Sequence, residues 1–252
     1  MPRETVSAMV PAMRIAELGP LTCRLAGGVD REGGGDGPLV VLCHGFGAPG
    51  DDLVGLWRLF DVPSETRFAF PEAPLSLPSP FPGMEARAWW PIDMVALERA
   101  LSSGATRNLM DQEPPELADA RGALDAAVTA MVAELQPSKL VLGGFSQGSM
   151  LALDLALRTD RELAGLCLFS SSYFAAASWK PRMAARAGLS VFQSHGRQDP
   201  ILPFSLAELL RDDLRAAGLE VAFAAFEGPH GIPPEVVASA SAFLRTQVLD
   251  GA

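Results

Sequence analysis

The pentapeptide Gly-Phe-Ser-Gln-Gly at residues 144–148 constrains the fold of this chain more than any other feature. It has the Gly-x-Ser-x-Gly spacing of a strand that turns sharply into a helix and exposes the serine hydroxyl at the tip. The apolar run 140–142 precedes it and the apolar stretch 149–157 follows it, as a strand and a buried helix require. The glycines leave room for strand and helix to cross closely. A Gly-rich turn without chemistry is the alternative interpretation.

The composition is that of an ordinary soluble globular protein, with 48% hydrophobic and 20% charged residues in 252 positions. No strong linker divides the sequence, so we expect one domain over residues 1–252. A net charge of -10 argues against binding to nucleic acid or anionic membranes, which call for basic patches. Cys23, Cys43 and Cys167 are widely spaced in strand-like runs, which predicts buried free thiols in a reducing compartment.

The sequence carries no continuous apolar segment typical of a signal peptide or a membrane span. We therefore expect a cytoplasmic protein without stable membrane insertion. The paired Cys and His spacings of metal sites are missing, so we expect neither a metal nor a cofactor.

Short apolar runs alternate with helix-length amphipathic segments, which predicts a mostly parallel sheet with helices on both faces. The predicted helices cover residues 51–60, 116–135, 204–217 and 234–248. The predicted strands cover residues 22–26, 39–43, 66–70, 140–142, 166–169, 189–193 and 221–226.

Two stretches interrupt this alternation. The glycine-rich segment 27–38 is followed by a strand, so we interpret it as a hairpin connection and not as a phosphate-binding loop. The segment 71–115 is rich in proline and mostly irregular, with one helix expected around 94–101. A long insertion of this kind is typical of a lid or a binding loop, although a surface excursion without a role is the alternative.

A serine nucleophile needs a base, and the base needs a carboxylate to orient it. In folds with this turn the order along the chain is serine, acid, histidine, which favours His230 over His44 and His195 as the base for Ser146. His230 follows the last predicted strand. Asp199 follows the strand before it and is the predicted acid, with Glu227 as the competitor.

An oxyanion hole needs backbone N–H groups that point toward the developing charge. Gln147 would supply one at the start of the helix after Ser146. Phe46 would supply the other from the glycine-rich loop after strand 39–43. The alternative interpretation of this loop is a tight turn with Asp51 or Asp52 as the N-cap of the next helix, which is compatible with the oxyanion role, and we expect His44 to have a structural role.

On these residues the chain resembles the phospholipase/carboxylesterase family of α/β-hydrolases, which includes the acyl-protein thioesterases. The resemblance implies the α/β-hydrolase fold, a triad of Ser146, Asp199 and His230, and the same two oxyanion donors. Segment 96–119 is more similar to the bacterial carboxylesterase-like members. The matching segments are His-Gly-Phe-Gly at 44–47, Phe-Pro-Glu-Ala-Pro at 70–74, Ala-Trp-Trp-Pro-Ile-Asp at 88–93, the pentapeptide at 144–148, His-Gly-Arg-Gln-Asp-Pro-Ile-Leu-Pro at 195–203 and Pro-His-Gly at 229–231.

The resemblance also implies that Trp89 lies near the active site and that part of the insertion covers the substrate pocket. The pocket residues that we expect are Phe46, Trp89, Trp90 and Leu202. The two tryptophans are equally compatible with packing in the core. Phe81, Met84 and Trp90 would provide an apolar surface for a homodimer.

We expect a serine hydrolase that cleaves small-molecule carboxylic esters of short to medium acyl chains through an acyl-enzyme. An acyl-thioesterase or a lysophospholipase with the same triad is the nearest alternative, because one acyl-transfer site serves all three reactions. The alternatives from other classes are a non-catalytic binding protein on the same scaffold and a metal-dependent hydrolase.

Overall fold

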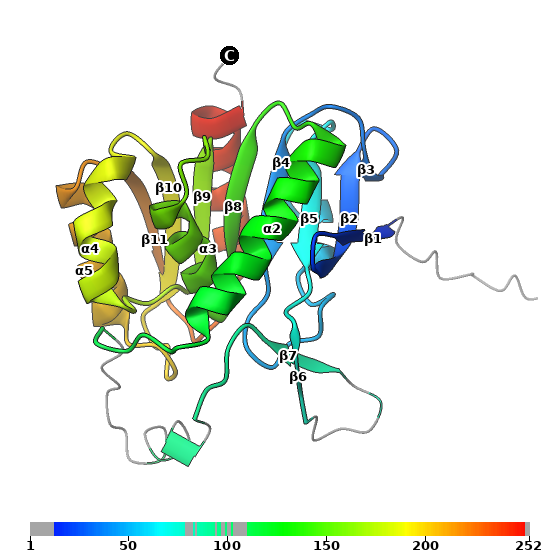
Figure 1. Cartoon of the computed structure of the whole chain (residues 1–252). Helices are drawn as coiled ribbons and strands as arrows, with labels where there is room; N and C mark the ends of the chain where they lie inside the picture. The colour runs from blue at the N-terminus through cyan, green and yellow to red at the C-terminus, as the bar shows by residue number, and fades with distance from the viewer. Residues whose placement is uncertain are drawn as a thin grey trace, which may run out of the picture.

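The computed structural model describes residues 13–78, 83, 85–93, 95, 96, 99, 102 and 110–249. Its main sheet has the order β1-β2-β5-β4-β8-β9-β10-β11, with β3 paired to β2 (Figure 1). From β5 to β11 neighbouring strands are parallel, whereas β1 and β2 form an antiparallel edge. The strands are β1 (Arg14–Leu18), β2 (Leu21–Gly28), β3 (Glu32–Gly34), β4 (Leu39–Cys43), β5 (Arg67–Pro71), β8 (Leu140–Phe145), β9 (Gly165–Phe169), β10 (Ser190–Gly196) and β11 (Glu220–Phe226).

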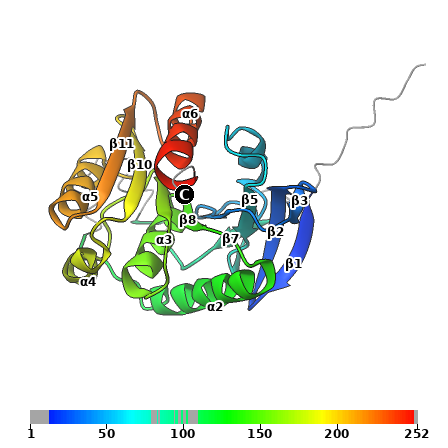
Figure 2. The ribbon, with the colours of Figure 1, turned by 90° about the horizontal axis from the view of Figure 1, so that it is seen from above.

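Helices cover both faces of this sheet, as Figure 2 shows from above. One face carries α2 to α5 and the other carries η1, α6 and η3. The mostly parallel sheet with helices on both faces is therefore confirmed. The helical elements are η1 (Val54–Arg58), α2 (Leu117–Leu135), α3 (Gln147–Arg158), α4 (Ala176–Met183), η2 (Ala184–Arg186), α5 (Phe204–Ala216), α6 (Pro234–Phe243) and η3 (Leu244–Leu249).

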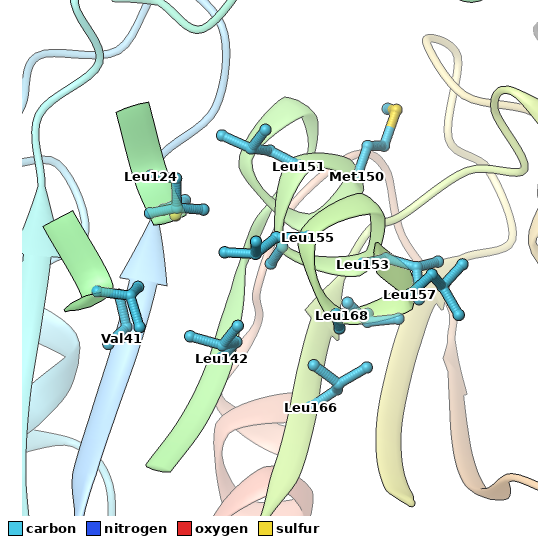
Figure 3. Close-up of a cluster of buried hydrophobic side chains, with 14 of the residues drawn as sticks. Val41, Leu124, Leu142, Met150, Leu151, Leu153, Leu155, Leu157, Leu166 and Leu168 are labelled. Carbon is cyan, nitrogen blue, oxygen red and sulfur yellow. The ribbon is translucent and has the colours of Figure 1, made fainter. Parts of the chain in front are cut away.

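The centre of the core is the contact between α3 and strands β8 and β9. Residues 147–157 of α3 are all buried and are mostly apolar, as is typical of a helix enclosed by its neighbours. Figure 3 shows Leu151 and Leu155 of α3 beside Leu142 of β8 and Leu124 of α2. This packing holds the start of α3, and hence the turn before it, rigidly at the edge of the sheet.

All seven predicted strands are present, with ends that differ by a few residues. The structure adds the edge strand β1, in which Ile15 is 59% exposed, so its sequence lacks the apolar pattern of a buried strand. Predicted helix 116–135 matches α2, and 204–217 matches α5. Predicted helix 234–248 is divided into α6 and the π-helical turn η3.

Two predictions in the N-terminal half were wrong. Segment 27–38 is not a hairpin connection, because β5 lies between β2 and β4 and pairs with both. Predicted helix 51–60 is only the 3-10 turn η1, and Gly55 at its second position is a residue that weakens a helix. Its N-cap is Leu53 and it has no side-chain cap, so the alternative interpretation with Asp51 or Asp52 as N-cap is not observed.

The insertion between β5 and α2 begins with the antiparallel pair β6 (Leu75–Leu77) and β7 (Ala86–Ala88). This pair lies beyond the carboxyl ends of the parallel strands, at the bottom of Figure 1. Val95, Ala96, Arg99 and Ser102 are helical, and the rest of the helix predicted at 94–101 lies outside the described residues.

Candidate active site

Ser146 occupies a strained turn between β8 and α3. Its φ of 53° and ψ of -119° lie in a region that residues with a side chain rarely adopt. A Cβ on Gly144 would lie 2.7 Å from the Gly148 carbonyl carbon, and one on Gly148 would lie 2.5 Å from the His44 oxygen. Both positions therefore require glycine, which is the physical basis of the sequence pattern. The N–H of Ser146 donates to Phe169 O at 2.9 Å and holds the turn against β9.

His230 and Asp199 are hydrogen-bonded to each other. Nδ1 of His230 donates to Oδ2 of Asp199 at 2.6 Å, so the proton is on Nδ1 and Nε2 is free to act as a base. The other oxygen, Oδ1, accepts the backbone N–H groups of Ile201 and Leu202 at 2.8 and 2.9 Å. These bonds hold the carboxylate, and through it the imidazole, in one orientation.

A second histidine, His195, contacts the same carboxylate. Its Nε2 is 2.9 Å from Leu202 O and 3.2 Å from Asp199 Oδ2, and its side chain is completely buried. Burial alone would raise the pKa of Asp199, but the hydrogen bonds from His195 and His230 outweigh it and hold that pKa well below 3.8. The lowered pKa favours the ionised carboxylate of Asp199. The sequence argument excluded His195 as a base and did not foresee this contact.

The loop that carries His230 is fixed by its neighbours. The hydroxyl of Ser170, after β9, donates to Gly231 O at 3.0 Å. Glu227, the competing acid, instead accepts a hydrogen bond from Nε2 of Gln198 at 2.6 Å and forms an ion pair with Arg197 at 3.2 Å at the surface. Asp199 is thus the carboxylate that orients His230, as the order along the chain predicts.

Ser146 and His230 line the same cavity of about 520 Å³. This volume lies within the range of small-molecule sites. Within the described part of the chain, Ser146 Oγ forms no hydrogen bond to His230, a link that in free enzymes often forms only when substrate binds. Much of the lining is apolar and comes from Phe46, Trp90, Ile92, Ala96, Pro114, Met150, Phe174, Ile201 and Leu202.

Both predicted oxyanion donors border this cavity. Phe46 and Gln147 are among its lining residues, and no described residue accepts a hydrogen bond from either backbone N–H. Gln147 is the first residue of α3, where the helix dipole favours a negative charge. Gly47 has a φ of 77° and donates its N–H to Arg87 O at 2.8 Å, which ties this loop to β7 of the insertion.

His44 is a buried structural residue. Its Nδ1 donates to Gly45 O at 2.8 Å, and its Nε2 accepts the N–H of Ala73 at 3.0 Å. Burial lowers the pKa of His44, which keeps the ring neutral. The ring therefore fixes the loop that carries Phe46 and has no nitrogen left for proton transfer.

Three of the four expected pocket residues line the cavity, namely Phe46, Trp90 and Leu202. Trp90 stacks on Phe174 with ring centroids 5.5 Å apart, so it is 3% exposed and offers no free apolar surface for a dimer. Trp89 lies behind the wall, where its indole N–H donates to His44 O at 2.9 Å. Phe81 and Met84, the other residues of the predicted dimer surface, lie outside the described residues.

The comparisons with known proteins agree with this geometry. A sequence model described as Phospholipase/Carboxylesterase matches residues 30–248. The chain belongs to the phospholipase/carboxylesterase family. The family assignment confirms the α/β-hydrolase fold and the carboxylesterase-type class of hydrolase that the sequence motifs predict.

Acyl-protein thioesterase 1 of Gibberella zeae is a similar curated member, with 30% identity over 229 residues that cover 83% of this chain and 90% of that protein. Among solved structures, esterase PE8 superimposes with a TM-score of 0.73 at 27% identity and covers 93% of this chain and 100% of its own. The Bacillus cereus carboxylesterase shares the fold, with a TM-score of 0.63 at 19% identity over 89% of this chain and 93% of its own.

Two features of the described residues concern other classes of site. Among the described residues, no group of three or more His, Cys, Asp or Glu side chains is arranged to hold a metal ion. In the same part of the chain, every helix is too short or too polar to cross a bilayer.

Proposed function

We propose that this family member hydrolyses small-molecule carboxylic esters of short to medium acyl chains, with Ser146, His230 and Asp199 as its catalytic triad. The observation that carries the proposal is the 2.6 Å bond from His230 Nδ1 to a buried, ionised Asp199, with Ser146 on the wall of the same cavity. This bond fixes the tautomer in which Nε2 of His230 accepts the serine proton.

The reaction has two halves. In the first, His230 Nε2 takes the proton of Ser146 Oγ as the oxygen attacks the ester carbonyl, and the resulting oxyanion accepts the N–H groups of Phe46 and Gln147. The tetrahedral species then expels the alcohol, to which His230 returns the proton. In the second half, His230 deprotonates a water molecule, which attacks the acyl-enzyme carbonyl. The tetrahedral species then collapses with release of the acid, and His230 returns the proton to Ser146 Oγ.

The cavity supports a substrate with an apolar acyl part. Phe46, Trp90, Met150 and Phe174 offer apolar surface beside Ser146, and about 520 Å³ holds a chain of modest length. A thioester substrate is the second candidate, favoured by the similarity to acyl-protein thioesterase 1. A lysophospholipid would undergo the same acyl transfer and is the third.

We also propose that segment 71–115 is a binding insertion within one domain, since Trp90, Ile92, Ala96 and Pro114 line the cavity. A cytoplasmic location and the absence of a nucleic-acid partner are supported by the three buried free cysteines and the net charge of -10. The homodimer stays a prediction, and sedimentation velocity of the full chain tests it directly.

The decisive experiment combines labelling with kinetics. A fluorophosphonate probe should label the wild-type protein at Ser146 and should not label Ser146→Ala. The same variant should hydrolyse p-nitrophenyl butyrate several powers of ten more slowly, because the nucleophile is gone. A wild-type protein without activity would indicate a non-catalytic binding protein. A Ser146→Ala variant with wild-type activity would refute the assignment of Ser146 as the nucleophile. Rates across p-nitrophenyl esters of graded length, acyl-thioesters and lysophosphatidylcholine then rank the three substrate classes.

A further inference from the structure

The side chain of Gln147 forms two buried hydrogen bonds that the catalytic scheme does not use. Its Oε1 accepts the backbone N–H of Trp89 at 2.9 Å, and its Nε2 donates to Trp90 O at 2.8 Å. Gln147 is 2% exposed, so both bonds lie in a medium of low polarity, where an unmade hydrogen bond is costly. One amide thus fastens the segment 89–90 of the insertion to the first residue of α3.

The same stretch of the insertion also holds the loop that carries Phe46. The indole N–H of Trp89 donates to His44 O at 2.9 Å. Arg87 forms two backbone bonds, accepting from Gly47 N at 2.8 Å and donating to Ala48 O at 3.0 Å. Residues 87–89 therefore form hydrogen bonds to both ends of the loop 44–48.

These contacts connect the two oxyanion donors through the insertion. The N–H of Gln147 is fixed on α3, and its own side chain holds segment 89–90. That segment continues into the residues that hold the loop bearing the N–H of Phe46. Oxyanion stabilisation depends on donors that are already in position when the charge develops. A hydrogen-bonded bridge through Trp89 and Trp90 therefore joins the two segments that carry these donors.

We propose that the side chain of Gln147 is a positioning residue that sets the spacing of the oxyanion donors by clamping the Trp89–Trp90 backbone. This inference rests on the proposed function, because it concerns the oxyanion hole of that reaction. It makes the insertion a part of the catalytic framework as well as a wall of the pocket. Kinetics can separate two effects of the clamp. Loss of the donor spacing lowers kcat for every acyl length, whereas loss of the pocket wall raises KM for long acyl chains only.

The test is Gln147→Met, which keeps the length of the side chain and removes both hydrogen bonds. We expect kcat to fall about 10–100-fold for both p-nitrophenyl acetate and octanoate, with KM changed less than about threefold, since a donor is displaced and not deleted. The affinity for a trifluoromethyl ketone, which forms a tetrahedral adduct with serine, should fall by the same factor as kcat/KM. The matched control is Gln193→Met, because Gln193 is equally buried, donates to Ala207 O at 2.9 Å and lies outside the cavity lining.

A second variant tests the other half of the bridge. Trp89→Phe removes the indole bond to His44 O and leaves the backbone that Gln147 clamps. Because the two bonds act in series, the double variant should lose less kcat than the product of the single losses. If Gln147→Met does not fold, Trp89→Phe alone tests the bridge, since it should also lower kcat at both acyl lengths, and an unchanged kcat would overturn the proposal.

Three results would overturn the positioning role: kcat of Gln147→Met within threefold of the Gln193→Met control, a loss confined to the KM for octanoate, or strictly multiplicative losses in the double variant. Each leaves the triad intact, provided that wild-type protein is active and Ser146→Ala is not. An inactive wild-type protein would instead refute the proposed function.

Discussion

Gly148→Ala adds a single methyl group at the point where α3 crosses β4, and the structure sets the size of its effect. The new Cβ would lie 2.5 Å from the His44 oxygen and closer still to the Cys43 carbonyl, whereas ordinary contacts begin near 3.4 Å. Both obstacles are backbone atoms, so α3 and β4 must separate by about 1 Å. Forcing extra volume into such a contact costs about 3 kcal/mol of unfolding free energy, at the upper end of overpacking effects.

The same displacement acts on catalysis, since Gly148 directly follows Gln147 and Cys43 lies three residues before Phe46. A shift of about 1 Å between groups that must act together costs on the order of 10²-fold in rate. We therefore expect kcat/KM for p-nitrophenyl butyrate to fall about 100-fold in the variant. The melting temperature should fall by about 6–12 °C, as a loss of about 3 kcal/mol implies for a chain of this size.

Gly122→Ala is the matched control, because Gly122 lies within α2 and its added Cβ would meet no atom within 4 Å. That variant should gain about 0.5–1 kcal/mol of stability from better helix propensity, with unchanged kinetics. The assays are urea unfolding and esterase kinetics on both variants. If Gly148→Ala matched Gly122→Ala in stability and rate, the close crossing would not constrain the elbow and the steric argument would be refuted.

Two further predictions concern charge. Asp199→Asn should lower kcat about 10⁴-fold, because an amide no longer holds the Nδ1–H tautomer of His230. The control Glu227→Gln should keep kcat within about threefold of wild type. Equal losses of kcat in the two variants would contradict the assignment of Asp199 as the acid. Burial lowers the pKa of His44 in the folded state, so the unfolded chain takes up a proton first as the pH falls. The stabilisation from His44 is therefore complete above about pH 6.5 and is lost as the pH falls below it. Urea unfolding should show a lower free energy of unfolding at pH 5.5 than at pH 7.5 in the wild-type protein, and a smaller decrease in His44→Gln. An equal decrease in the two proteins would disprove the role of His44. Asp199 adds nothing to this window, because its depressed pKa places the loss of its stabilisation below pH 3.8.

The elements that the sequence predicted best are those whose pattern reflects burial on both faces. Strand 39–43 has the same ends in the structure as in the prediction, and all its residues are buried. The elements missed were exposed or short, such as β1 at the sheet edge and the pair β6–β7 in the insertion. Their formation depends on partners that are distant in the sequence, which local patterning does not reveal.

For the site, the residue types and their order along the chain were enough to select Ser146, Asp199 and His230, because a strained elbow needs glycines and each partner follows a parallel strand. Contacts across the chain were not accessible in this way. The bonds of Gln147 to Trp89 and of Ser170 to Gly231 join residues whose separation is set only when distant strands, loops and the insertion pack together.

The sequence by itself thus determined the chemistry, since a nucleophile, a base and an acid are recognisable from local turns that only certain residues can form. Tertiary structure alone decided how that chemistry is held. The orientation of the His230 imidazole depends on a 2.6 Å hydrogen bond between residues 31 apart in the sequence. The side-chain bonds of Gln147 to Trp89 and Trp90, at 2.9 and 2.8 Å, join residues 58 and 57 apart, and no local pattern encodes such distances.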